Sequence, residues 1–189
     1  MRKIIAFENT SLDGYFVDDN GDMSWAHIGS VDAEFNAFVS ENNSGDSEFI
    51  FGRKTYELMA SYWPTPMAQE QNPIVAETMN SRSKHVFSRT LNELSWDNSH
   101  PKNGDLISEV QNLKESVGPD LVILGSGSIV SQLSQAGLID EFHVVVNPIV
   151  LGTGRTLFEG KRPALQLKLD RLLGFKNGKV FLSYGVASS

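Results

Sequence analysis

The chain has 189 residues and a formal net charge of −7, and it contains no cysteine. This length suits one domain with a substantial core, which we expect over residues 1–189, and the acidic charge argues against nucleic acid or an anionic membrane as a partner. The missing cysteines exclude disulfides and thiolate zinc sites, no apolar run suits a signal peptide or a membrane span, and we therefore expect a cytoplasmic protein.

The first part of the chain has the pattern of a strand followed by a helix. Residues 3–7 are typical of a short buried strand, which the polar residues 8–11 end and the Asp13–Gly14 turn closes. A strand so early in the chain is expected near the centre of a sheet. Apolar side chains at helical spacing then predict a helix over residues 31–42.

A second strand and helix meet at a glycine. Residues 48–51 predict a brief strand that stops at Gly52, and residues 53–61 predict a helix. Residues 62–81 contain three prolines and little periodicity. We therefore expect a surface loop there, with a turn of helix near residues 75–79 at most.

The middle of the chain repeats this alternation. Residues 84–87 predict a strand, residues 98–104 are polar and indicate a loop, and residues 106–117 form an amphipathic helical pattern. A further apolar run, residues 121–124, leads through a glycine- and serine-rich turn into a helix that Gly137 is expected to end.

The last part of the chain predicts strands. Apolar side chains alternate over residues 142–147, and residues 165–173 and 179–185 read as two strands joined by an Asn-Gly turn. The tail is therefore an antiparallel hairpin. Alternating strands and helices followed by strands predict an α/β fold around a mixed, mainly parallel sheet.

Three predicted strands end in residues that suit a phosphate. Ligands of open α/β sheets bind beyond the carboxyl ends of the strands. Glycines let backbone N–H groups approach a ligand, a helix N-terminus offers unpaired donors, and cationic or hydroxyl side chains add further contacts. The candidates are Gly52, Arg53, Lys54 and Thr55 at the first junction, Ser88 and Arg89 at the second, and Gly125, Ser126, Gly127, Ser128 and Ile129 at the third. Together they predict a site for an extended phosphorylated cofactor.

Each junction also has a purely structural interpretation. The third junction is one glycine short of the dinucleotide fingerprint, because Val130 occupies the completing position. Arg53, Lys54 and Arg89 could equally be solvated surface charges. The Gly152-Thr-Gly154 segment is better explained as a turn than as another phosphate loop.

An ordered set of motifs over the full chain resembles the dihydrofolate-reductase-like superfamily, and within it the branch that includes the reductase domain of riboflavin biosynthesis. The motifs lie at residues 11–14, 51–57, 86–89, 123–128, 138–141, 147–148, 151–154 and 157–158. The resemblance implies a central mainly parallel sheet and the cofactor NADPH. Homodimers are usual in this branch, so we expect a homodimer.

The resemblance also implies roles for the three junctions. Arg53, Lys54 and Thr55 would bind phosphate groups, Ser88 and Arg89 would flank the adenosine 2′-phosphate, and the segment from Gly125 to Ile129 would cradle the pyrophosphate. The loop over residues 13–25 would cover the nicotinamide and the substrate.

Four further residues are candidates for the substrate side. Trp25 and Phe35 could form apolar walls, and Asp13 or Asp32 could orient or protonate the acceptor. Asp13 has an alternative role in an Asp-Gly turn, and Asp32 could cap a helix. The spacing of Asp32 from Trp25 departs from the folate reductases, which makes folate a doubtful substrate.

Three hypotheses follow for function. The leading one is an NADPH-dependent reductase that transfers a hydride to a small heterocyclic, pyrimidine- or pterin-like, or to a carbonyl or imine substrate. The second is a nucleotide-binding or regulatory module with little catalysis, and the third is a structural protein whose junctions are only turns. Hydride transfer needs little acid-base machinery, and the four histidines show no metal-binding spacing, so we predict no metal.

Overall fold

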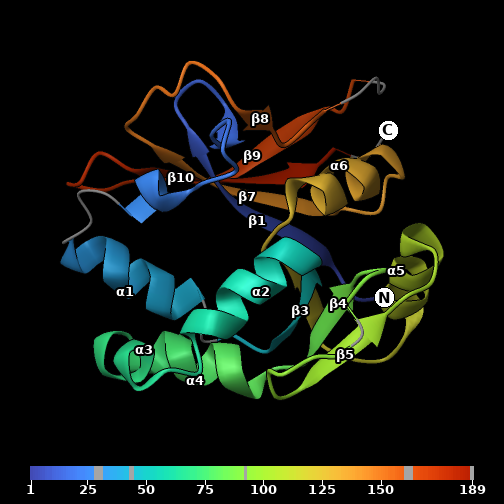
Figure 1. The fold of residues 1–189 in the computed structure, drawn as a ribbon. Helices are drawn as coiled ribbons and strands as arrows, with labels where there is room; N and C mark the ends of the chain where they lie inside the picture. Colours follow the sequence, from blue (N-terminus) through green and yellow to red (C-terminus); the bar gives the residue numbers. More distant parts are fainter. Residues whose placement is uncertain (28–31, 43–44, 92, 160–163, 188–189) are drawn as a thin grey trace.

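A computed structural model describes residues 1–27, 32–42, 45–91, 93–159 and 164–187. The strands and their bounds are β1 (Ile4–Ser11), β2 (Tyr15–Val17), β3 (Ser47–Gly52), β4 (Lys84–Phe87), β5 (Ser99–Lys102), β6 (Asp120–Ile123), β7 (Glu141–Asn147), β8 (Arg155–Thr156), β9 (Leu167–Gly174) and β10 (Val180–Val186). The main sheet has the order β5-β4-β3-β6-β1-β7-β10-β9, and β2 pairs with β8 in a second small sheet (Figure 1).

The main sheet is parallel from β5 to β7 and antiparallel at its other end. β1 lies between β6 and β7 and pairs in parallel with both, which confirms the prediction of a central first strand. β10 runs antiparallel to β7 and to β9. The turn between β9 and β10 places Gly178 at φ +83°, as the predicted Asn-Gly hairpin requires. The predicted α/β fold with an antiparallel C-terminal hairpin is confirmed.

Helices cover both faces of the main sheet (Figure 1). The helices are η1 (Ser24–His27), α1 (Ala33–Asn42), α2 (Arg53–Tyr62), α3 (Pro66–Gln71), α4 (Pro73–Ser81), α5 (Leu106–Glu115) and α6 (Gly127–Gln135). Ile50 of β3 packs with the buried side chains of α5 and α6, whereas its neighbours Phe49 and Phe51 pack with those of α2 and α4. Alternation along the strand therefore divides the core into two layers. α1 lies on the same face as α2, where Phe38 packs against the β7–β10 end of the sheet.

The secondary structure of two segments differs from the prediction. In one segment prolines begin helices, and in the other polar side chains belong to a strand. Most of residues 66–81 form α3 and α4 rather than a loop, and α4 includes the helical turn expected near residues 75–79. Pro66 and Pro73 stand in the first turn of each helix, where a missing N–H costs nothing. The polar stretch predicted as a loop includes β5, an edge strand that pairs with β4 from Ser99 to Lys102. Backbone hydrogen bonds, and not an apolar face, hold this strand.

The first strand is also longer than predicted. β1 continues through the polar residues that were expected to end it, because β7 pairs with it from Ile5 as far as Ser11. Its pairing with β6 stops at Ala6, opposite Ile123. β1 therefore extends beyond β6 at the carboxyl edge of the sheet. The predicted helix over 31–42 begins at Ala33, with residue 31 outside the described residues. Within the described ranges, no helix is long and apolar enough to cross a membrane.

Candidate cofactor and substrate site

The chain leaves β3 and β6 toward opposite faces of the sheet. These two strands are neighbours, yet α2 follows β3 onto one face and α6 follows β6 onto the other. The point where the connections of adjacent strands diverge is the usual ligand site of open α/β sheets, and we call this place, between the carboxyl ends of β3 and β6, the crevice. The first and third predicted junctions therefore meet at one place.

The two junctions touch through glycines. The backbone N–H of Gly52 donates to the carbonyl oxygen of Gly125 at 3.2 Å. A Cβ atom at Gly52 would stand 2.6 Å from Oγ of Ser126, and one at Gly125 would stand 2.9 Å from Oγ1 of Thr55. Gly125 also has φ +103° and precedes a cis peptide bond to Ser126. Any other residue at these positions would push the two loops apart.

Both helices begin at this contact without a side-chain cap. Gly52 is the N-cap of α2 and Ser126 the N-cap of α6, and neither makes a side-chain capping hydrogen bond. The Ser126 hydroxyl instead pairs with that of Ser128 at 2.8 Å. In α6 the N–H of Ile129 donates to the carbonyl oxygen of Ser126 at 2.9 Å. The N–H groups of Gly127 and Ser128 and those of the first turn of α2 are therefore the donors left for a ligand, with the partial positive charge of the two helix dipoles behind them. An anion is the ligand this arrangement attracts.

The cationic side chains of the first junction lie on the surface. Arg53 forms an ion pair with Glu57 one turn along α2, at 3.0 Å, and Lys54 is exposed. Exposed ion pairs of this kind are weak. Both side chains can therefore turn toward a phosphate at the start of α2 without a large cost in free energy.

The second junction lies one strand farther along the same edge. The Ser88 N–H donates to the carbonyl oxygen of Lys102 at 3.2 Å, and the Ser88 hydroxyl accepts from the N–H groups of Thr90 and Leu91. Arg89 is exposed, and its charge, after the hydrogen bonds from Ser108, helps to lower the pKa of Asp105.

Lys102, which the sequence analysis did not single out, adds a cation at the end of β5. It forms an ion pair with Glu109 at 3.2 Å. Because β5 itself was predicted as a loop, no pattern placed this residue beside Ser88.

Asp13 connects two loops at the carboxyl edge. Its carboxylate accepts from the Ser11 hydroxyl at 2.6 Å and from the N–H groups of Leu151 and Gly152 at 3.2 and 2.8 Å. The hydrogen bond from Ser11 and those backbone bonds hold the pKa of Asp13 below its usual value. Asp13 therefore lies in a turn, as its alternative interpretation expected, and its carboxylate connects the β1–β2 turn to the loop that precedes β8.

Asp32 is buried at the start of α1. One oxygen accepts from the N–H groups of Glu34 and Phe35, and the other from the N–H of Asn177 at 3.0 Å. Burial favours the protonated form, but the backbone bonds from Asn177, Phe35 and Glu34 outweigh it and lower the pKa of Asp32. Asp32 is therefore the helix cap that the alternative interpretation described.

The two predicted aromatic walls lie on the α1 face of the sheet. Trp25 is buried in η1, and its indole N–H donates to the carbonyl oxygen of Asp22 at 3.1 Å. Phe35 of α1 meets Phe175 edge-on, with ring centroids 5.1 Å apart. Phe35 packs in the cluster that α1 forms with β7 and β10, and η1, which carries Trp25, contacts β1.

A buried lysine, absent from the predicted site, links these walls. Nζ of Lys179 donates to the carbonyl oxygen of Ala26 at 2.5 Å and to Oδ1 of Asn147, and it lies 5.2 Å from the Phe35 ring centroid. Burial lowers the pKa of Lys179. The hairpin signal locates this residue in the sequence, but nothing in its pattern indicates that its side chain is buried.

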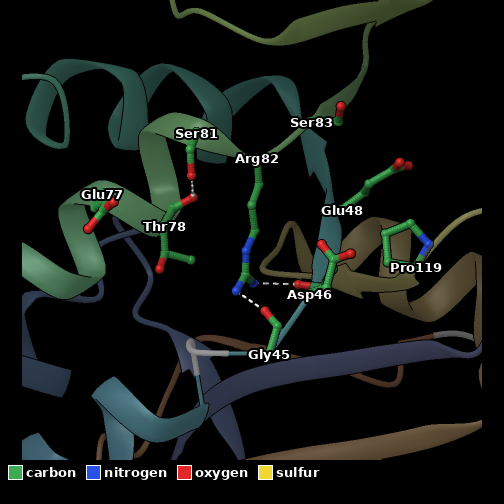
Figure 2. A pocket seen from close by; sticks show the side chains of 10 residues that line it. Gly45, Asp46, Glu48, Glu77, Thr78, Ser81, Arg82, Ser83 and Pro119 are labelled. Carbon is green, nitrogen blue, oxygen red and sulfur yellow. Dashed lines mark hydrogen bonds between the residues drawn. The ribbon is translucent and has the colours of Figure 1, made fainter.

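Two hollows in the surface lie at places other than the crevice. A cavity of about 90 Å³ lies on the α1 face beside Phe7, Leu124 and His143. A larger hollow of about 580 Å³ lies at the opposite, amino-terminal edge of the sheet. Figure 2 shows Arg82 extending through it, where its guanidinium donates to the carbonyl oxygen of Gly45 and to the Ser47 hydroxyl. Helix N-termini and strand ends define the cofactor site, so the larger hollow is not part of it.

Searched over the described ranges, the structure has no group of three or more His, Cys, Asp or Glu side chains placed to hold a metal ion. The site is therefore one of backbone donors and of single charged side chains.

Comparison with known proteins gives a consistent family and fold. The model of the family described as the RibD C-terminal domain matches residues 2–181. The uncharacterized protein YyaP of Bacillus subtilis is 30% identical over 183 residues, which cover 97% of this chain and 94% of that protein.

Two solved structures illustrate the fold. A putative riboflavin biosynthesis protein from a Shewanella species has a TM-score of 0.74 at 24% identity and covers 98% of this chain and 99% of its own. Dihydrofolate reductase of Enterococcus faecalis, complexed with NADP(H), has a TM-score of 0.64 at 12% identity. The match covers 98% of this chain and 97% of that reductase. At these identities the likeness shows a dihydrofolate-reductase-like fold.

Proposed function

The chain belongs to the RibD C-terminal domain family, and from this premise and the geometry of the crevice we propose that it is an NADPH-dependent reductase. Its substrate is a small heterocycle, pyrimidine- or pterin-like, or a compound with a carbonyl or imine group. Riboflavin- and folate-related reductases share this fold, as the neighbouring structures indicate. That likeness supports the class of reaction, while the substrate is part of the proposal.

The contact between Gly52 and Gly125 is the observation that carries the proposal. It brings two uncapped helix N-termini together, which suits the two phosphates of a dinucleotide. The hydroxyls of Ser126 and Thr55 stand close to these glycines, which adds two side-chain donors beside the helix N-termini. The residues present therefore fit a pyrophosphate.

The order of the strands favours one direction for the proposed cofactor. Ser88 and Arg89 follow β4, the crevice lies between β3 and β6, and β1 and β7 come next along the edge. A dinucleotide with its 2′-phosphate at Arg89 and its pyrophosphate in the crevice has its nicotinamide at β1. When bound there, the reduced nicotinamide supplies the hydride.

The chain surrounds the proposed nicotinamide position with groups that orient the ring and exclude water. Trp25 and Phe35 form apolar walls on the α1 face, and Lys179 holds the Trp25 segment against the sheet through Ala26. Asp13 and Asp32 act by orienting the surrounding loops, because their lowered pKa values keep both carboxylates ionised at neutral pH.

A fluorescence titration tests the proposal. NADPH and NADH are titrated against the wild type and an Arg89→Ala variant, with the tryptophans as reporters and calorimetry as a check. We expect NADPH to bind more tightly than NADH, and Arg89→Ala to weaken NADPH about tenfold while leaving NADH unchanged. Absence of binding by either nucleotide would refute the proposal.

A nucleotide-binding or regulatory module with little catalysis is the second candidate. One observation favours it: every oxygen of Asp13 and Asp32 already accepts a hydrogen bond, so neither side chain offers a proton. Tight NADPH binding without turnover of any pyrimidine, pterin, carbonyl or imine acceptor would support this module over the reductase.

We also propose that the protein forms a homodimer through β9. This strand is one of the two edges of the main sheet, and it exposes Leu167, Leu169 and Leu172 to 38%, 47% and 58%. An uncovered edge with apolar side chains favours association. Sedimentation of the wild type should give a dimer mass, and the double variant Leu169→Lys with Leu172→Lys should give a monomer.

A further inference from the structure

Glu8 is a buried acid in β1 whose hydrogen-bonding capacity is not used. Its side chain is only 4% exposed, and Oε1 has no hydrogen-bond partner among the described residues. Buried polar atoms are nearly always paired, so an unpaired carboxyl oxygen inside a sheet requires an explanation. Burial raises the pKa of Glu8 to about 8. At neutral pH the side chain is therefore a carboxylic acid, with one O–H donor and acceptor oxygens beside it.

The position of Glu8 is set by the pairing of β1. The last residue of β1 that pairs with β6 is Ala6, opposite Ile123. Glu8 comes two residues later, level with the point where the chain leaves β6 at Gly125. Ala6 packs with Ile129 of α6, and Glu8 shares that face because side chains alternate along a strand. Glu8 thus borders the crevice on the side of the uncapped α6 N-terminus.

Within the described ranges, the elements around Glu8 offer it no counter-charge. α6 has no ionisable side chain from Gly127 to Gln135, and β7 presents Phe142, Val144 and Val146 on this face. β2 contributes Tyr15. Arg155 of β8 already pairs with Glu159 and lies over the Phe16 ring, at 5.7 Å from its centroid. Among the described residues no side chain satisfies Oε1 of Glu8, and a neutral donor and acceptor on a ligand would do so.

The direction of the cofactor brings such a group to this place. If the proposed function holds, on which this inference rests, the nicotinamide lies at β1, beyond the pyrophosphate in the crevice. Its ring carries a primary carboxamide, which has a carbonyl acceptor and an N–H donor side by side. A carboxylic acid has the complementary donor and acceptor at the same spacing.

We propose that Glu8 binds the carboxamide of the nicotinamide, its O–H donating to the amide oxygen and its carbonyl oxygen accepting from the amide NH2. The paired hydrogen bonds fix the rotation of the ring about its ribose. Glu8 would hold the carboxamide from the α6 side of β1, the side on which its own side chain lies. Glu8 is thus a cofactor-binding residue that orients the hydride donor.

The loop over residues 13–25 controls access to Glu8. Phe16 of this loop stands on the first turn of α6, where a Cβ at Gly127 would be 2.4 Å from its Cζ. Phe16 itself is 7% exposed. Phe16 therefore covers the start of α6 on the side where Glu8 lies.

Two ligands separate the inference from the proposed function. We would measure by calorimetry the affinities of NADPH and of 2′-phospho-ADP-ribose, which lacks the nicotinamide, for the wild type, Glu8→Leu and Glu8→Gln. Glu8→Leu removes both hydrogen bonds without leaving an unpaired group, so this variant should fold. It should weaken NADPH about tenfold or more and leave 2′-phospho-ADP-ribose unchanged. Glu8→Gln keeps a donor and an acceptor and should restore NADPH binding to within about threefold.

A pH series and a matched control complete the test. Wild-type affinity for NADPH should fall above pH 8, because ionised Glu8 has no donor, whereas Glu8→Gln should show no such fall. Ser183→Ala, a buried polar position on β10, should change neither affinity. Unchanged NADPH binding by Glu8→Leu, or an equal loss for both ligands, overturns the assignment of Glu8. If neither ligand binds the wild type, the proposed function fails as well.

Discussion

The backbone N–H of Gly52 donates a hydrogen bond of 3.2 Å to the carbonyl oxygen of Gly125, which joins the ends of β3 and β6. The contact holds the first turns of two helices side by side although the helices run onto opposite faces of the sheet. Because no side chain fits at either glycine, the shape of the crevice depends on these two positions. Substitutions there should affect ligand binding and folding together.

The first prediction concerns Gly125→Ala. The residue has φ +103°, and its new Cβ would stand 2.9 Å from Oγ1 of Thr55. We expect the free energy of unfolding to fall by about 1–3 kcal/mol and NADPH affinity to fall at least about tenfold. Urea unfolding and fluorescence titration measure the two effects.

Gly137→Ala is the matched control for this prediction. Gly137 also has a positive φ, +67°, but a Cβ there meets open space. It should lose about 1 kcal/mol of stability and no NADPH affinity. Equal losses of NADPH affinity in both variants would contradict the proposal that NADPH binds in the crevice.

The second prediction concerns Lys179→Met. The variant loses the donor to the carbonyl oxygen of Ala26 and to Oδ1 of Asn147, so the η1 segment should separate from the sheet more often. We expect faster chymotryptic cleavage after Trp25, measured by limited proteolysis with mass spectrometry. Lys176→Met, an exposed position on the same hairpin, should cleave at the wild-type rate. No increase in Lys179→Met would show that other contacts hold η1.

The crevice could be predicted from the sequence because its signals are local. An apolar run that ends at Gly52, and another that ends at Gly125, predict strands whose following helices start at bare backbone. Their meeting in space follows from the order of parallel strands. The same logic succeeds for the C-terminal hairpin, where the Asn177–Gly178 pair selects the turn.

The rest of the fold and site depends on contacts that are distant in sequence. Pro66 and Pro73 were interpreted as breaks, whereas they begin α3 and α4. β5 has polar side chains and exists because β4 offers it a backbone edge. Glu8 was expected to end a strand as the first of the polar residues 8–11, whereas pairing with β7 over residues 5–11, including Glu8 opposite Val144, keeps it inside the sheet. Lys179 is buried by Ala26 and Phe35, which no sequence pattern places beside it.

The third prediction concerns Asp13→Asn. The amide cannot accept from the Ser11 hydroxyl and from the N–H groups of Leu151 and Gly152 at the same time, as the carboxylate does. We expect faster amide hydrogen exchange at Leu151 and Gly152, with NADPH affinity unchanged. Mass spectrometry or NMR measures the exchange.

Asp19→Asn is the control for that measurement. Asp19 lies in the same loop but accepts from the side chain of Thr153 at 2.5 Å, rather than from backbone N–H groups. Exchange at Leu151 and Gly152 should not change. If Asp13→Asn leaves exchange unaltered and still abolishes turnover, Asp13 takes part in proton transfer.

The fourth prediction concerns the pH dependence of stability in Glu8→Gln. Burial raises the pKa of Glu8 from 4.5 to about 8, so the folded protein keeps a proton that the unfolded chain releases between these values. The unfolded state binds fewer protons in this window, and the contribution of Glu8 to stability therefore falls as pH rises from 4.5 to 8. This contribution to the free energy of unfolding falls by at most about 1.4 kcal/mol per pH unit. Below pH 4.5 the contribution is complete.

Urea unfolding of the wild type and Glu8→Gln at pH 5, 6, 7 and 8 measures this contribution. Groups common to both proteins, including the buried histidine His85, cancel in the difference between them. Relative to the wild type, Glu8→Gln should therefore gain stability steadily as pH rises toward 8, because its amide carries no charge to bury. A difference that stays constant across this range would show that Glu8 ionises in the folded protein near its ordinary pKa, and a carboxylate at that position could not donate to an amide oxygen.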